Sequence, residues 1–159
     1  MKKIICIIPF FLLSFLFIGK ISAQVDTSFI CTARVMNASH ADQPKMDPLL
    51  NDVKAKLTKK PFNTYNYFVQ VKQNDYVVIK DKPATKIILD GNSFMNLDYQ
   101  QRITQDGKIS FVISYSMIDA KGKPKPPTKI TVQNGDNVIL PIGKINGVDA
   151  FVVLKFAGA

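Results

Sequence analysis

Hydrophobic and polar residues alternate with a period of two along most of the chain from residue 63 onward. The alternation is clearest around Asp106-Gly107, a dipeptide that tolerates the positive φ angles of a tight hairpin turn. The strand before this turn is expected to place four side chains on one face: Met95, Leu97, Tyr99 and Ile103. Arg102 falls on the opposite face. Such regular alternation is typical of strands with one packed side and one wet side.

Other extended segments are separated by turn signals at intervals of about 8–12 residues. They are expected at residues 28–38, 65–71, 76–80, 85–89, 109–117, 130–132, 138–142 and 151–156. Parallel α/β folds need a helix between most strands, and this chain has room for one. The sequence therefore predicts an all-β fold, an antiparallel β-sandwich or partly open barrel of about eight strands.

One short peripheral helix is predicted at residues 47–60. Asp47 is suited to capping its start, and Pro48 fits the first helical position, where a missing N–H costs nothing. An apolar stripe at helical spacing follows, made of Leu49, Leu50, Val53 and Leu57. Pro61 ends the segment. We expect this helix to lie against an edge or an open end of the sandwich.

The N-terminus is typical of a cleavable signal peptide at residues 1–23. Lys2 and Lys3 precede an apolar run of about fifteen residues, and Ala23 is a small residue at the expected cleavage point. The remainder, 24–159, is one domain's worth of chain without a transmembrane segment. This organisation predicts a periplasmic or secreted protein, exported through a cleaved signal peptide.

The chain is basic, with a formal net charge of +9, and all twelve of its acidic residues are Asp. Such a charge favours anionic neighbours, including outer-membrane lipid and acidic glycan. Basic and aromatic residues are too scattered to indicate a nucleic-acid site.

Candidate catalytic chemistry is sparse. Cys31 sits in an apolar stretch typical of a buried hydrophobe, and His40 is the only histidine, so no metal or cofactor site is indicated. A thiolate–base pair of Cys31 and His40 would need the chain to fold back between them. Asp98 and Asp119 lie on or near adjacent predicted strands, and a carboxylate pair is what glycoside hydrolysis requires.

Two features are candidate ligand contacts. A proline-stiffened basic loop at residues 120–128 carries three lysines, and a fourth follows it: Lys121, Lys123, Lys125 and Lys129. Tyr65 and Tyr67 are suited to stacking on sugars or bases if they face solvent. A groove lined by both features would bind a polyanion.

The order of several short motifs resembles a group of small exported β-rich proteins of Gram-negative bacteria that have no assigned function. The motifs are Asp47-Pro48-Leu49-Leu50, Lys60-Pro61-Phe62-Asn63-Thr64-Tyr65, Lys82-Pro83-Ala84-Thr85 and the turn at Ile142-Gly143. The resemblance covers most of residues 28–156, and its motifs are structural rather than catalytic.

These observations favour a non-enzymatic binding or accessory module of the bacterial cell envelope. Its partner would be an envelope protein, docking on an exposed strand edge, or an anionic polymer. A small hydrolase of envelope polymers that uses Asp98 or Asp119 is one alternative. A structural subunit of a larger envelope assembly is another, and strand order and oligomeric state stay open.

Overall fold

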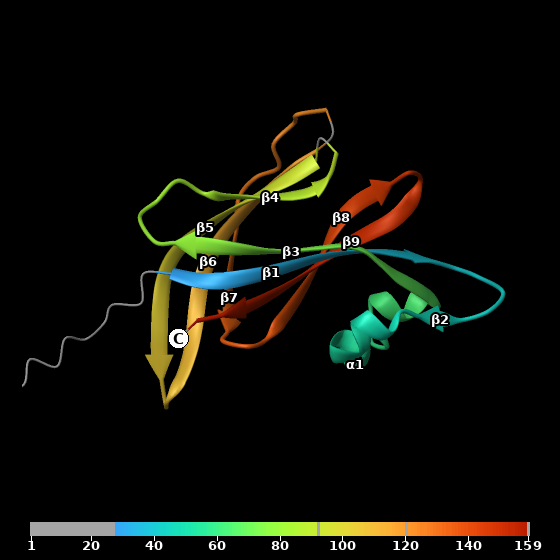
Figure 1. Cartoon of the computed structure of the whole chain (residues 1–159), viewed down its shortest axis with the longest axis horizontal. Helices are drawn as coiled ribbons and strands as arrows, with labels where there is room; N and C mark the ends of the chain where they lie inside the picture. The colour runs from blue at the N-terminus through green and yellow to red at the C-terminus, as the bar shows by residue number, and fades with distance from the viewer. Residues whose placement is uncertain (1–27, 92, 120, 159) are drawn as a thin grey trace, which may run out of the picture.

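The computed structural model describes residues 28–91, 93–119 and 121–158 (Figure 1). The predicted signal peptide at residues 1–23 lies outside the described residues. Among those described, no helix has the length and apolar character needed to cross a membrane.

Nine strands and three short helical turns make up this part of the chain. The strands are β1 (Ser28–Ser39), β2 (Lys45–Met46), β3 (Tyr67–Ile79), β4 (Thr85–Asp90), β5 (Ser93–Gln105), β6 (Lys108–Ile118), β7 (Thr128–Gln133), β8 (Asn137–Ile145) and β9 (Val148–Ala157). The helical turns are η1 (Pro48–Val53), α1 (Lys54–Leu57) and η2 (Phe62–Thr64), and together they form the helical segment.

The strands form two sheets that pack face to face. The five-stranded sheet has the order β2-β3-β1-β9-β8, and the four-stranded sheet has the order β4-β5-β6-β7. All pairings are antiparallel except the short one between β2 and β3. The predicted all-β antiparallel sandwich is therefore confirmed.

The central strands β1 and β9 are buried on both faces in their middle, at residues 33–36 and 150–154. Val35 and its cross-strand partner Val152 face the four-stranded sheet and belong to the core between the sheets. Met36 and its partner Phe151 point the other way, into a second core under the helical segment. This explains why residues 150–154 are continuously apolar, since both faces of β9 are buried there, whereas the exposed Lys155 lies where the outer face is no longer covered.

The hairpin at Asp106-Gly107 is confirmed, and both turn residues have the positive φ that the turn requires, 51° and 72°. The predicted faces of β5 hold only as far as Tyr99. A β-bulge between Tyr99 and Gln101 inserts one residue, so Arg102 pairs with the buried Phe111 and Ile103 moves to the other face. The prediction for Ile103 and Arg102 was wrong because one extra residue reverses every side chain after it.

A second bulge lies opposite β1, between Val35 and Met36, where Val71 is the extra residue of β3. Residues 72–75, between the two segments predicted at 65–71 and 76–80, also pair with β1, so both segments belong to one continuous strand. This strand begins at Tyr67, because Tyr65 instead ends the helical turn η2.

The helical segment differs from the predicted helix in form and position. Asp47 caps it as expected, accepting a hydrogen bond from the Leu49 N–H at 3.0 Å. Its first six residues are 3-10 rather than α. Three residues per turn align Leu50 with Val53 and turn Leu49 out to solvent. The segment covers the outer face of the five-stranded sheet, not an edge, because Met36 and Phe151 present apolar side chains there.

One ion pair ties the helical segment to the sheet. The Arg34 guanidinium, on β1, donates to both carboxylate oxygens of Asp52, at 2.8 and 2.7 Å, and to the Leu49 carbonyl at 2.9 Å. Arg34 is only 6% exposed. A second ion pair, Lys56 with Asp136 at 2.7 Å, joins the same segment to the β7–β8 turn but is about half exposed at both partners.

We expect Asp52→Ala to lower the free energy of unfolding by about 2 kcal/mol, because it leaves a buried guanidinium without its carboxylate. The loss stays below the 3–5 kcal/mol that a fully buried pair costs, since the Asp52 side chain is 42% exposed. Asp136→Ala is the matched control and should cost about 1 kcal/mol or less. Urea unfolding of both variants measures the difference, and equal losses would contradict the anchoring role of Arg34.

Asp52→Ala should also change how the free energy of unfolding depends on pH in the acidic range. Hydrogen bonds from Arg34 hold the pKa of Asp52 below its usual value. A lowered folded-state pKa adds stability above the unfolded-state value of about 3.9, and that stability is lost as the pH falls through the folded value. The gap between the natural chain and Asp52→Ala should therefore be complete at neutral pH and shrink below about pH 4.

Candidate functional site

The basic loop after β6 is folded back on itself rather than extended. Asp119 Oδ1 accepts hydrogen bonds from the backbone N–H groups of Lys121 and Lys123, both at 2.9 Å. The Lys125 N–H donates to the Met117 carbonyl at 2.8 Å, and Pro124 forms a β-bridge with Ile118. These bonds fix the backbone that carries the lysines against the end of β6.

This loop forms one wall of a pocket of about 360 Å³, here called the lysine pocket. Its rim carries Lys121 and Lys125 from the loop and Lys144 from β8. Its floor includes Leu89 and Met117, which belong to the core between the sheets. The pocket thus lies where that core opens, at the end of β6 opposite the Asp106-Gly107 hairpin.

The charges around the lysine pocket are mostly positive. Three lysines line it, and Asp119 is the one acidic residue among the lining residues that the structure describes. One oxygen of Asp119 already accepts two backbone hydrogen bonds, which direct its charge into the loop. The pocket therefore offers a positive rim to an anion, with partial compensation from one carboxylate.

Two of the predicted lysines lie outside this pocket. Lys129 is on β7, opposite Ser114, and is exposed on the outer face of the four-stranded sheet. Lys123 is exposed at the loop tip and does not line the pocket. Neither contacts the cavity, and the position of Lys129 on β7 lies five strand residues, roughly 16 Å, from Asp119 at the pocket.

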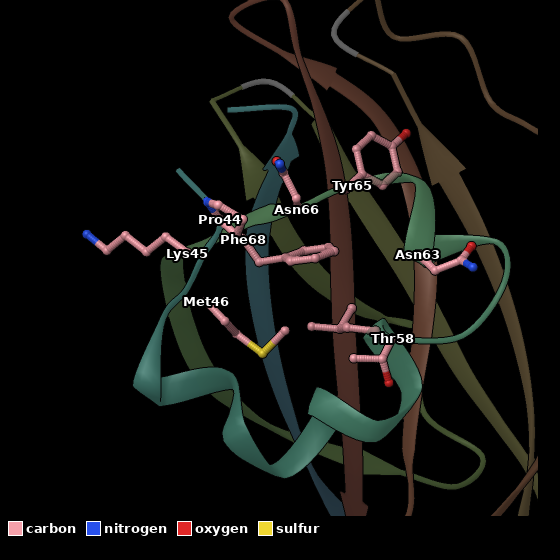
Figure 2. Close-up of a pocket in the computed structure, with 9 residues that line it drawn as sticks. Pro44, Lys45, Met46, Thr58, Asn63, Tyr65, Asn66 and Phe68 are labelled. Carbon is pink, nitrogen blue, oxygen red and sulfur yellow. The ribbon is translucent and has the colours of Figure 1, made fainter. Parts of the chain in front are cut away.

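Tyr65 lines a different cavity, here called the apolar pocket, of about 390 Å³ (Figure 2). Figure 2 shows Met46 and Phe68 between the strands and the helical segment, while the Lys45 side chain points away. Phe68 belongs to the core under the helical segment, so this pocket and the lysine pocket lie on opposite faces of the five-stranded sheet.

The ring of Tyr65 is held by its neighbours. Its hydroxyl donates to Asp149 Oδ2 at 3.1 Å, and its ring lies 5.6 Å from Phe151 in an edge-to-face contact. His40 stacks on it with ring centroids 5.7 Å apart. Burial raises the pKa of Tyr65, and the hydrogen bond to Asp149 raises it further. These contacts hold the ring of Tyr65 in place, and the half-buried side chain faces the apolar pocket rather than the lysines.

Tyr67 lies on the opposite face of β3 from Phe68, as its pairing with Ser39 shows. The structure therefore does not bring Tyr65, Tyr67 and the lysines into one groove. It brings Lys121 and Lys125 together, and it adds Lys144 to them.

Asp98 and Asp119 do not face each other. Asp98 pairs with Ser114 on β6, and Asp119 follows the end of the same strand. Five residues of strand separate these positions by roughly 16 Å. Paired carboxylates in glycosidases are about 5–9.5 Å apart, so this arrangement does not match that chemistry.

Cys31 and His40 are also far apart. Cys31 is on β1 and His40 follows its last residue, so nine extended residues separate them by roughly 30 Å. Cys31 is fully buried, and burial raises the pKa of its thiol to about 12. In the described part of the chain, no cluster of three or more His, Cys or Asp residues is placed to hold a metal ion.

Sequence reasoning missed Lys144 and Ile142 as pocket residues. They lie on β8, which belongs to the other sheet from β6. The packing of the two sheets places them beside the loop, and the sequence carries no local signal of it. The turn-like Ile142-Gly143 is the nearest hint, because Gly143 has a φ of 106° and marks a bulge of β8.

Comparison with known proteins found no matching family model, no similar curated protein and no similar solved structure.

The burial of Cys31 gives a direct chemical test of the sandwich. In a Cys6→Ala background, we expect no reaction of Cys31 with a thiol reagent at pH 8 until the chain unfolds, because its thiol is uncharged and out of contact with water. Moving the thiol one residue, with Cys31→Ala and Thr32→Cys, places it on the opposite face of β1 and should give prompt labelling. Prompt labelling of Cys31 in the folded chain would contradict its place in the core.

Proposed function

We propose that this chain is an exported, non-enzymatic binding module that holds an anionic ligand at the lysine pocket. The observation that carries the proposal is the convergence of Lys121 and Lys125, from the β6–β7 loop, and Lys144, from β8 of the other sheet, on one pocket at the end of the core. A cavity of about 360 Å³ lies within the range of small-molecule sites, about 300–1,000 Å³.

The fixed loop backbone supports a binding role. Hydrogen bonds to Asp119 and the β-bridge at Pro124 hold the loop in shape before any ligand arrives. A site that is already ordered loses less conformational entropy on binding. Lys123, exposed in the same loop, adds a positive charge outside the pocket, so a polymer longer than the pocket would also be attracted.

Export is part of the proposal. The features of residues 1–23 support passage across the inner membrane, and the resemblance to small exported β-rich proteins implies the same compartment. Anionic glycans and lipid headgroups are abundant there. The separation of Asp98 from Asp119 gives no support to a hydrolase that would use them together.

Polyphosphate is a suitable probe of the rim. We expect it to bind with an affinity that falls steeply between low and high salt, because the exposed lysines act through screened charge. Lys144→Ala should weaken binding about threefold to fivefold at low salt. Lys108→Ala removes the same charge at the other end of β6 and should leave binding nearly unchanged.

Fluorescence titration at two salt concentrations measures these affinities. Binding that does not depend on salt would remove the anion-binding role. An equal loss of polyphosphate affinity in Lys144→Ala and Lys108→Ala would show that polyphosphate is attracted by the net charge of the protein alone. That result would also exclude the lysine pocket as the binding site.

A further inference from the structure

The floor of the lysine pocket is apolar, which a purely ionic ligand would not use. Leu89 and Met117 are almost fully buried, and they extend the core between the sheets to the bottom of the cavity. Ile118 and Ile142 complete the apolar lining, and Ile142 packs against the same core. A polyanion held by the lysines would leave this surface in contact with water.

The positions of charge and apolar surface match one kind of ligand. The rim has three lysines, from a loop and from β8, and beneath them the half-buried Ile118 and Ile142 lie next to the buried Leu89 and Met117 of the core. A molecule with an anionic head and an apolar chain satisfies both parts at once, since the head stays at the wet rim while the chain leaves water.

The geometry points to a single-chain amphiphilic anion, an alkyl phosphate or alkyl carboxylate, as the ligand class of the lysine pocket. This inference rests on the proposed function and narrows its ligand. The head lies among Lys121, Lys125 and Lys144, and the first part of the chain lies on Met117 and Ile142. A cavity of about 360 Å³ holds the head and a short stretch of chain, not a whole two-chain lipid.

A series of monomeric ligands tests the inference on the full chain. Calorimetric titration with inorganic phosphate, ethyl, butyl and hexyl phosphate should show affinity rising about fourfold for each methylene that is buried. The rise should level off when the chain outgrows the pocket. Vesicles containing an anionic two-chain phospholipid serve as the membrane arm, and we expect them to bind no better than polyphosphate does.

Two isoleucines of β8 provide a matched pair of variants. Ile142→Thr replaces the ethyl group of this side chain with a smaller, polar hydroxyl, so hexyl phosphate should bind several-fold more weakly while polyphosphate binds as before. Ile139 is also half-buried but packs against the core under the helical segment. Ile139→Thr should leave both affinities unchanged and controls for a general loss of stability.

The outcomes separate this inference from the proposed function. Polyphosphate binding that needs Lys144, together with equal affinity for inorganic and hexyl phosphate, would contradict an amphiphilic ligand. The proposed anion site at the lysine pocket would then still hold. Strong binding to vesicles without any chain-length dependence in solution would also overturn it, in favour of a membrane surface. Failure of every anion to bind would overturn both.

Discussion

The burial of β1 and β9 on both faces is the constraint on which the rest of the structure depends. These two strands pair along nine residue positions. In the middle of the pair side chains on both faces are withdrawn from water, whereas Ile30 and Lys155, near one end, are exposed. An antiparallel pair of this kind needs one cover for each face. The four-stranded sheet covers one face, and the helical segment covers the other, anchored by the Arg34–Asp52 ion pair.

The location of the lysine pocket follows from this arrangement. The helical segment covers the outer face near Met36 and Phe151, whereas the core between the sheets ends at the lysine pocket, beside the half-buried Ile118 and Ile142. The β6–β7 loop is fixed at that end by its hydrogen bonds to Asp119, so its lysines stand at the rim of exposed apolar surface. The same packing that stabilises the sandwich thus sets charge and apolar surface side by side.

Local patterns in the sequence predict local structure well here. The β5–β6 hairpin was predictable because Asp106-Gly107 has the turn chemistry and its flanks alternate. The cap at Asp47 was equally clear. The bulges at Val71 and Gln100 were not, because a single extra residue leaves no mark in composition yet reverses the faces beyond it. The 3-10 form of η1 was missed because it depends on tertiary packing. Leu50 and Val53 are both buried in the core under the helical segment, and the local sequence does not show where that core lies.

The site was only half predictable for a related reason. Lys121 and Lys125 stand out as part of a dense basic loop, but Lys144 and Ile142 come from a strand of the other sheet. Their placement depends on strand order, a long-range property that no local pattern contains. Tyr65 is the opposite case. As an aromatic residue among polar ones it was predicted to contact a ligand, but in the structure its hydroxyl donates to Asp149 and its ring packs against Phe151.

The most direct measurement is a methyl NMR titration of the folded chain with hexyl phosphate. The account predicts that the methyl signals of Met117 and Ile142 shift together as the ligand is added, while that of Met46, in the apolar pocket on the opposite face of the five-stranded sheet, stays in place. Shifts confined to Met46, or no shift at Met117 and Ile142 at saturating ligand, would contradict it.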